Sequence, residues 1–252
     1  KLILLNKLII NKIIFLLCSF IALPIVLIVR IISPFFLIRF GYIVASRMGH
    51  FAFDVEYYLT QKRLGIFPSN SLDLFFYRWG SPANKFFSKL AKRNLNILSF
   101  TKYLFTVNKL LPGVNRNIIK PAHSHYSRDI HGYLRQCGAQ LKFNSEENKS
   151  GISFLNQFGL VKKDKYVCLL VRDSKYLDTY HKTGADWSYH DYRNSDIDSY
   201  EEAIIALVNK GYWVFRMGKI VREPLKIKHP RVIDYANLKL RNDFLDIWLM
   251  AN

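Results

Sequence analysis

Residues 1–40 form an almost continuous apolar stretch in which every charged residue is basic. Residues 13–29 carry no charge, and the apolar positions resume after Arg30. A helix needs about 20 apolar residues to span a bilayer, so this stretch is long enough only if Arg30 extends its guanidinium toward the interface. Pro24 and Pro34 are expected to kink the helix. The pattern therefore predicts a helical membrane anchor over residues 1–40.

The topology of this anchor has two alternatives, a single span and a re-entrant or in-plane helix. Lys1, Lys7 and Lys12 precede the uncharged run, and Arg39 and Arg47 follow it. Because both flanks are basic, the positive-inside rule assigns no orientation to a single span. A re-entrant or in-plane helix would hold both flanks on the cytoplasmic face, and we prefer it slightly. A cleaved signal peptide and a buried core helix fit less well, since the run is long and has basic flanks.

Beyond residue 40, apolar runs of strand length alternate with segments of helical periodicity. The continuous apolar run at 166–171 is typical of a central parallel strand. Asp198 with Glu201 resembles a capping box, which predicts a helix that begins there and ends at Gly211. The predicted strands are Gly41–Ser46, Leu72–Trp79, Tyr166–Val171, Tyr212–Met217 and Val232–Tyr235, and the predicted helices are Phe51–Lys62, Pro82–Arg93, 198–211 and Asn242–Met250.

This alternation predicts an α/β fold with parallel sheets and helices on their faces. The polar stretch 142–165 is expected to contain a boundary between two lobes. We predict an N-terminal α/β lobe over 41–150 and a partial, Rossmann-like lobe over 151–252. The predicted helix at 82–93 has Lys85, Lys89 and Lys92 on one side and apolar residues on the other, and its basic side is either solvated or lipid-facing.

The net charge of +18 is concentrated in the first half of the chain. Residues 1–150 contain 21 Lys and Arg against 6 Asp and Glu, whereas residues 151–252 contain 16 against 13. Basic residues beside an apolar segment suit an anionic membrane surface. Zinc-finger spacing, RNA-recognition aromatic motifs and basic-zipper heptads are absent from the sequence, so we expect no nucleic-acid partner. The three widely separated cysteines suit a reducing cytoplasm.

Candidate chemistry gathers where the predicted strands end, which is where open α/β sheets bind ligands. Arg172 follows one strand, and Arg216 and Lys219 end another. The loop 189–196, YHDYRNSD, is rich in polar and aromatic side chains and precedes a helix. Cations near a helix N-terminus form a plausible diphosphate site, although acids in the same loop would compete with a phosphate. A surface ion-pair network around Arg172 explains that residue equally well.

Several segments resemble a bacterial glycosyltransferase family associated with surface-polysaccharide loci. The most specific combination is YRNSDI, GYWVFRMGK and RNDFLDIW. The segments that carry the resemblance are 45–59, 72–85, 128–134, 167–181, 192–204, 211–219 and 241–252. The resemblance implies two Rossmann-like lobes of the glycosyltransferase-B type, a nucleotide-sugar donor and no essential metal or cofactor. Members of the family continue with a further strand and turn, so the C-terminal lobe is expected to be incomplete here.

The resemblance also implies roles for individual residues. The donor diphosphate or nucleotide would be bound by six residues: Arg172, Arg193, Asn194, Ser195, Arg216 and Lys219. His50 is the candidate general base for the acceptor hydroxyl, because imidazole titrates near neutrality; a helix-capping or core histidine is the equal alternative. No histidine spacing predicts a metal site, and His123 and His125 are expected to lie in a loop.

The sequence thus predicts a glycosyltransferase on the cytoplasmic face of the bacterial inner membrane. Its expected partners are a nucleotide-sugar donor, a glycan or lipid-linked acceptor and the anionic membrane surface. The alternative from another class is a non-catalytic membrane-surface adaptor of a polysaccharide assembly complex. Nucleotide diphosphate should raise the melting temperature of the enzyme and leave that of the adaptor unchanged.

Overall fold

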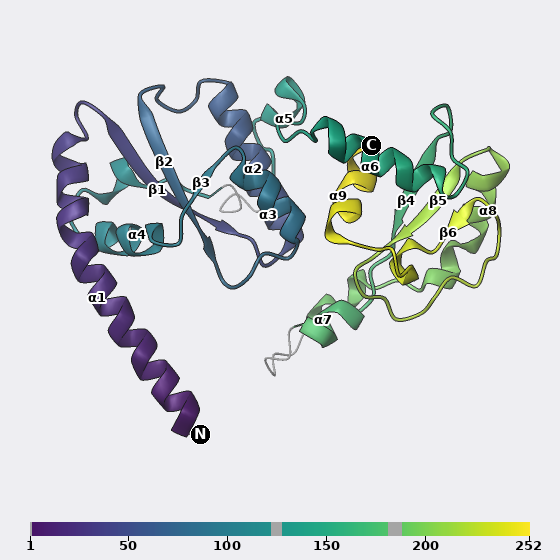
Figure 1. Ribbon diagram of the computed structural model, residues 1–252, viewed down its shortest axis with the longest axis horizontal. Coiled ribbons are helices and arrows are strands. Elements are labelled where there is room, and N and C mark those ends of the chain that lie inside the picture. The colour runs from purple at the N-terminus through teal and green to yellow at the C-terminus, as the bar shows by residue number, and fades with distance from the viewer. Residues whose placement is uncertain (1, 122–127, 181–187) are drawn as a thin grey trace. The chain divides into compact units, whose positions relative to one another are not determined.

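The computed structural model describes residues 2–121, 128–180 and 188–252, and it shows a mixed α/β chain with two compact units (Figure 1). The first unit covers residues 1–142 and the second covers residues 143–252. The unit boundary therefore lies eight residues before the predicted one at 150/151. The predicted boundary falls inside helix α6 (Ser145–Asn156), which packs with the second unit.

The first unit contains a three-stranded sheet and the long N-terminal helix. Its elements, in chain order, are α1 (Leu2–Ile32), β1 (Leu37–Val44), α2 (Met48–Arg63), β2 (Ser71–Arg78), α3 (Lys85–Lys92), β3 (Asn96–Ile97), α4 (Thr101–Leu110), η1 (Val114–Asn117) and α5 (Tyr133–Cys137).

The second unit contains a three-stranded sheet of its own. Its elements, in chain order, are α6 (Ser145–Asn156), β4 (Tyr166–Leu170), α7 (Lys175–Tyr180), η3 (Ser188–Arg193), η4 (Ile197–Tyr200), α8 (Glu201–Asn209), β5 (Trp213–Met217), β6 (Val232–Ile233), η5 (Tyr235–Asn237) and α9 (Asp243–Ala251).

Both sheets are parallel, as the alternation of strands and helices predicts. The order is β1-β2-β3 in the first sheet and β4-β5-β6 in the second. In the first sheet, successive side chains of each strand point to opposite faces. Phe40 packs toward α1 and α4, whereas Tyr77 meets Phe51 of α2 edge to face. Helices therefore cover both faces of this sheet.

Helix α1 ends earlier than the predicted anchor, and residues 37–40 belong to β1. The helix stops at Ile32, before the Ser33–Pro34 step, because a proline disfavours helical backbone in the residue that precedes it. Pro24 lies inside the helix. The apolar positions after Pro34 are strand residues, so the predicted anchor boundary at residue 40 is wrong.

Arg30 does not extend toward an interface but joins α1 to the end of α4. Its Nε donates to Asn108 Oδ1 at 2.9 Å, and Nη2 donates to the Asn108 carbonyl at 2.9 Å. Nη2 also reaches the Leu111 carbonyl, and Nη1 reaches that of Pro112. The last carbonyls of a helix lack intrahelical partners, and a cation there opposes the negative end of the helix dipole.

The core of the second unit lies on one face of β5. Trp213, Phe215 and Met217 of this strand pack there against Phe154 of α6 and Trp248 of α9. Helix α6 approaches α9 at Gly151, where an added Cβ would lie 2.1 Å from the Trp248 ring. Only glycine fits between these helices at that point.

The predicted capping box at the start of α8 is wrong. The chain first forms the short turn η4, in which Asp196 is the cap and its carboxylate accepts from the Asp198 backbone N–H. Asp198 instead pairs with Lys226. Helix α8 then begins at Glu201 without a side-chain cap, and its Ile204 is fully buried while Ala203 is exposed.

Candidate functional site

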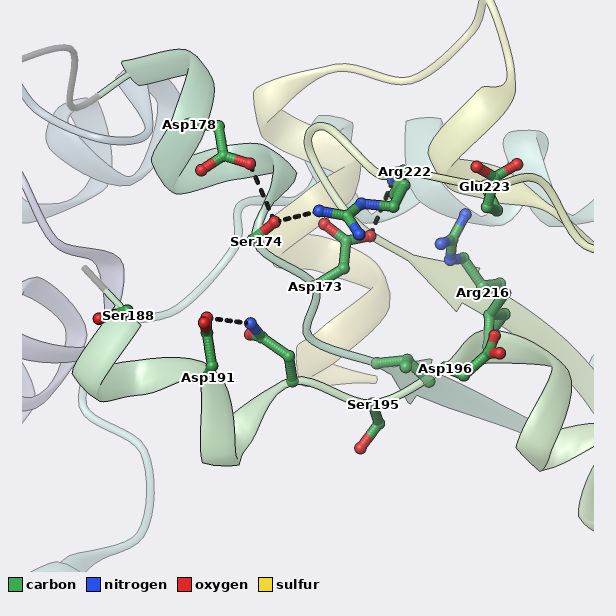
Figure 2. Close-up of a pocket in the computed structure, with 13 residues that line it drawn as sticks. Asp173, Ser174, Asp178, Ser188, Asp191, Ser195, Asp196, Arg216, Arg222 and Glu223 are labelled. Carbon is green, nitrogen blue, oxygen red and sulfur yellow. Dashed lines mark hydrogen bonds between the residues drawn. The ribbon is translucent and has the colours of Figure 1, made fainter. Parts of the chain in front are cut away.

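A pocket of about 690 Å³ lies at the carboxyl ends of β4 and β5 in the second unit (Figure 2). Three loop segments line it: the turn after β4, the segment before α8 and the loop after β5. The lining residues are Val171, Asp173, Ser174, Asp178, Ser188, Asp191, Asn194, Ser195, Asp196, Ile197, Arg216, Arg222 and Glu223. Ligands of open α/β sheets bind at this edge, so the fold places the pocket where a ligand is expected.

Arg216 forms part of the pocket wall and is only 1% exposed. Strand alternation turns Arg216 to the pocket side of β5 while Met217 packs into the core. Its Nη1 donates to Asp234 Oδ1 at 3.3 Å. Its Nε is buried and has no hydrogen-bond partner within the described part of the chain. A buried guanidinium with an unsatisfied donor is costly unless a ligand supplies the acceptor.

A hydrogen-bond network holds the loop after β5 against the loop after β4. The Asp173 carboxylate accepts from the backbone N–H of Lys175 at 2.9 Å and from that of Arg222 at 2.8 Å. Arg222 Nη2 donates to Ser174 Oγ at 2.5 Å, and this hydroxyl donates to Asp178 at 2.9 Å. Figure 2 shows this chain of side chains along one wall of the pocket. The network positions the Arg222 guanidinium at the pocket.

The opposite wall is built by the segment before α8. The Ser195 backbone N–H donates to the Arg172 carbonyl at 2.9 Å, which ties this segment to the end of β4. Asn194 Nδ2 donates to Asp191 Oδ1 at 2.9 Å. The Asn194 Oδ1 atom is buried and has no partner among the residues that the structure describes. Asn194, with a buried amide oxygen, and Ser195 therefore belong to the lining of the pocket.

The pocket carries both signs of charge. Its carboxylates outnumber its two guanidinium groups: the acids are Asp173, Asp178, Asp191, Asp196 and Glu223. Guanidinium groups donate to phosphate or carboxylate oxygens, whereas carboxylates accept hydrogen bonds from hydroxyl groups. The pocket is thus suited to a ligand that combines an anionic group with many hydroxyl groups. Within the described ranges, no group of three or more His, Cys, Asp and Glu side chains is placed to hold a metal ion.

Three of the six predicted donor-binding residues line the pocket: Asn194, Ser195 and Arg216. Arg172 lies outside the lining residues, and its backbone carbonyl accepts from the Ser195 N–H. Arg193 turns back along its own turn, where its Nε donates to the Tyr192 hydroxyl at 2.8 Å and its guanidinium lies 5.2 Å from the ring centre. Lys219 is half-buried and lies outside the lining residues.

Sequence reasoning missed Arg222 and Ser174 as pocket residues. Ser174 follows directly on Arg172 and Asp173, so its position after an apolar strand was an available signal. Arg222 lies in the irregular stretch between β5 and β6, where no periodic pattern indicates which side chain turns inward. Its position depends on its backbone bond to Asp173, a residue 49 positions earlier.

His50 lies in the first turn of α2, in the first unit, and is half-buried. His50 follows the end of β1 by six residues, near the carboxyl edge of the first sheet, and α2 begins two residues before it rather than at the predicted Phe51. The expected loop at 123–125 lies outside the described residues. Cys168 of β4 donates to the Leu249 carbonyl at 3.3 Å, and burial raises the pKa of its thiol to about 11, so it is a packed thiol and not a nucleophile.

No family model matches this chain, and no curated protein or solved structure is significantly similar to it. The chemistry of the pocket and of α1 therefore carries the functional conclusion.

Proposed function

We propose that this protein is a glycosyltransferase that moves a sugar from a nucleotide-sugar donor to a membrane-associated or surface-polysaccharide acceptor. In this proposal the two units are the lobes of a glycosyltransferase-B-like enzyme. The second unit binds the donor, and the first unit binds the acceptor. The protein acts at the cytoplasmic face of the bacterial inner membrane, where α1 attaches it.

The observation that carries the proposal is the buried Arg216 guanidinium with its unpartnered Nε at the pocket wall. A donor diphosphate supplies acceptor oxygens for such a group. Arg222 is the second cation at the pocket, and Ser174 holds it there. Two guanidinium groups neutralise the charge that builds on the departing nucleotide diphosphate, so in this mechanism no metal ion is required.

The excess of carboxylates supports a sugar nucleotide rather than a simple phosphate. Five acids in one pocket would repel an inorganic anion, but a ribose and a hexose present several hydroxyl donors to them. Asn194 adds an amide oxygen that has no partner within the described residues. Arg172, Arg193 and Lys219 do not line the pocket and are given no direct donor contact here.

The acceptor role rests on the position of His50. An imidazole that follows the first strand of a parallel sheet lies at the edge where such sheets bind ligands. Near neutral pH it can take a proton from an acceptor hydroxyl as that oxygen attacks the anomeric carbon. His50→Gln should then reduce transfer to the acceptor more than hydrolysis of the donor.

The direct test is a donor-hydrolysis panel on the full-length protein in detergent, with uridine, guanosine, adenosine and cytidine diphosphate sugars. We expect release of the nucleoside diphosphate from one donor class. Lys228→Ala, which removes an exposed cation from the same unit, should match the wild type, and Arg216→Ala should not. Absence of turnover with every donor, together with an unchanged melting temperature in nucleotide, would favour the adaptor.

A further inference from the structure

Helix α1 has two parts with different surroundings. In its second half, Ala22, Val26 and Val29 lie on one face and pack against the first unit, where they meet Phe40 and Leu104. Further toward the N-terminus, the Phe15 ring still contacts Tyr103 of α4, with 5.5 Å between centroids. In Figure 1 the helix before this contact projects away from the rest of its unit.

The projecting part is too short to cross a bilayer by itself. Among the described residues, α1 has the length and apolar composition of a spanning helix over Ile9–Ile32. However, the helix lies against α4 from Phe15 to Arg30. Residues 2–14 extend beyond that contact, and at about 1.5 Å per residue they reach about 20 Å, against a hydrocarbon core of about 30 Å. They suffice to enter one leaflet.

The outer face of α1 is apolar along the docked part as well. The Leu16, Leu17 and Phe20 side chains are exposed, and Phe20 is 77% exposed. Lys12 and Lys102 lie near this surface, and the Lys102 ammonium sits 5.4 Å from the centre of the Phe15 ring. An exposed apolar helix face with cations beside it matches a bilayer whose headgroups are anionic.

The projecting end of α1 lies on the side of the unit where the strands of the first sheet end. Helix α4 runs opposite to β1. Phe105, in the middle of α4, contacts Tyr42 near the end of β1. Asn117, which follows α4, donates to the carbonyl of Ile38 at the start of β1. Helix α1 runs in the same direction as α4, since Phe15 meets Tyr103 and Arg30 meets Asn108. The N-terminal part of α1 therefore extends past the carboxyl edge of the sheet.

That edge carries the side chains that favour a lipid–water interface. Trp79, directly after β2, is 62% exposed and has left-handed backbone with φ of 61°, which is uncommon for a residue other than glycine. The Arg78 guanidinium lies 4.5 Å from the ring centres of both Trp79 and Tyr42. Tryptophan and basic side chains are enriched at the headgroup level of membranes.

We infer that α1 enters a single leaflet of an anionic bilayer and holds the carboxyl edge of the first sheet at the headgroups, with Arg78, Trp79 and Lys102 in contact with lipid. This inference rests on the membrane location in the proposed function and is independent of the donor chemistry. In this arrangement, lipid covers the exposed apolar face of α1. It also places the edge that carries His50 next to the membrane, so that an acceptor held in the bilayer reaches it directly.

The test uses the full-length protein on vesicles of phosphatidylcholine and phosphatidylglycerol whose acyl chains carry bromine at a shallow or a deep position. Bromine quenches tryptophan fluorescence at short range, and Trp213 and Trp248 are buried in the second unit. Trp187, the fourth tryptophan, lies outside the described residues and is replaced by Phe in every protein compared. We expect shallow bromine to quench the protein that keeps Trp79 and Trp79→Phe to lose most of this quenching.

A second variant separates one-leaflet insertion from a span. This variant is Phe20→Trp, made in the Trp79→Phe background. If Ile9–Ile32 spanned the bilayer, the new tryptophan would lie near the bilayer centre. If α1 enters a single leaflet, it lies near the lipid–water interface. Stronger quenching by shallow than by deep bromine supports the single-leaflet inference, and the reverse order overturns it. Vesicle binding without quenching of Trp79 overturns the proposed edge contact. Failure to bind vesicles at all overturns the membrane location itself and leaves the donor-site proposal standing.

Discussion

Asp234 Oδ1 accepts a hydrogen bond from Arg216 Nη1 at 3.3 Å, and the same carboxylate accepts two further hydrogen bonds. Its Oδ2 accepts from the Leu225 backbone N–H at 3.0 Å and from Asn237 Nδ2 at 2.7 Å. Asp234 is therefore shared among three donors and engages only one nitrogen of Arg216. The pair holds the guanidinium at the pocket wall, and its buried Nε has no partner among the described residues.

Replacing Arg216 should reduce turnover more than it reduces stability. We expect Arg216→Ala to lose about 10²-fold or more in kcat, the size typical of losing one contact to transition-state charge. Arg216→Lys should recover only part of this, because an ammonium does not reproduce the planar donor fork. Steady-state kinetics with the active donor, beside denaturant unfolding of each variant, measures both quantities. Near-normal kcat in the folded fraction of Arg216→Ala would show that Arg216 merely pairs with Asp234.

Arg222 and Arg193 form a matched pair, because both are exposed arginines of the same unit and only Arg222 lines the pocket. Arg222→Ala should weaken nucleotide binding about tenfold, since a charge-assisted hydrogen bond contributes about 1.5–3 kcal/mol. Arg193→Ala should change it by less than about twofold, because its guanidinium is held on Tyr192. Competition against a fluorescent nucleotide measures both. A larger loss of nucleotide affinity in Arg193→Ala than in Arg222→Ala would instead support the sequence-based prediction that Arg193 binds the donor.

The sequence predicted the pocket wall best where a regular strand positions the side chain. The apolar run of β5 predicts that Arg216 and Met217 point to opposite faces, and the structure confirms it. Arg193 was placed in the site by its position in a polar loop, yet a 3₁₀ turn directs it to Tyr192. Arg222 was missed because its position depends on a long-range bond to Asp173 rather than on local periodicity.

The N-terminal helix was predicted in type but not in extent. Hydropathy alone does not distinguish the apolar face of an anchor from an apolar strand, so residues 37–40 were assigned to the anchor although they pair in β1. Arg30 appeared as an interruption of a membrane segment. In the structure it is a contact between two helices that are far apart in the sequence.

Arg30 should accordingly contribute to the stability of the first unit. Arg30→Ala removes hydrogen bonds to the end of α4, and we expect the free energy of unfolding to fall by about 2 kcal/mol. Arg30→Lys should lose about half as much, because an ammonium keeps the charge but not the fork. Denaturant unfolding in a mild detergent measures the loss. An unchanged midpoint for Arg30→Ala would contradict the docking of α1 on α4.

Gly151 should tolerate no side chain. Gly151→Ala places a Cβ within 2.1 Å of the Trp248 ring, so α6 and α9 must separate, which is expected to cost about 1–3 kcal/mol. Gly49→Ala is a suitable control, because an added Cβ meets no atom within 4 Å there. Thermal unfolding followed by the near-ultraviolet signal of tryptophan compares the two. Equal melting temperatures for both variants would mean that the α6–α9 packing is looser than the structure shows.

The central claim is that the pocket at β4 and β5 binds the diphosphate of a nucleotide sugar, and titration calorimetry of nucleoside diphosphates into the full-length protein tests it most directly. We predict saturable binding of at least one nucleoside diphosphate, its loss or strong weakening in Arg216→Ala, and its retention in Lys228→Ala. Inorganic phosphate should bind much more weakly, because the pocket's carboxylates need hydroxyl partners. Absence of heat with all four nucleoside diphosphates, or equal affinity in the wild type and Arg216→Ala, would contradict the proposed donor site.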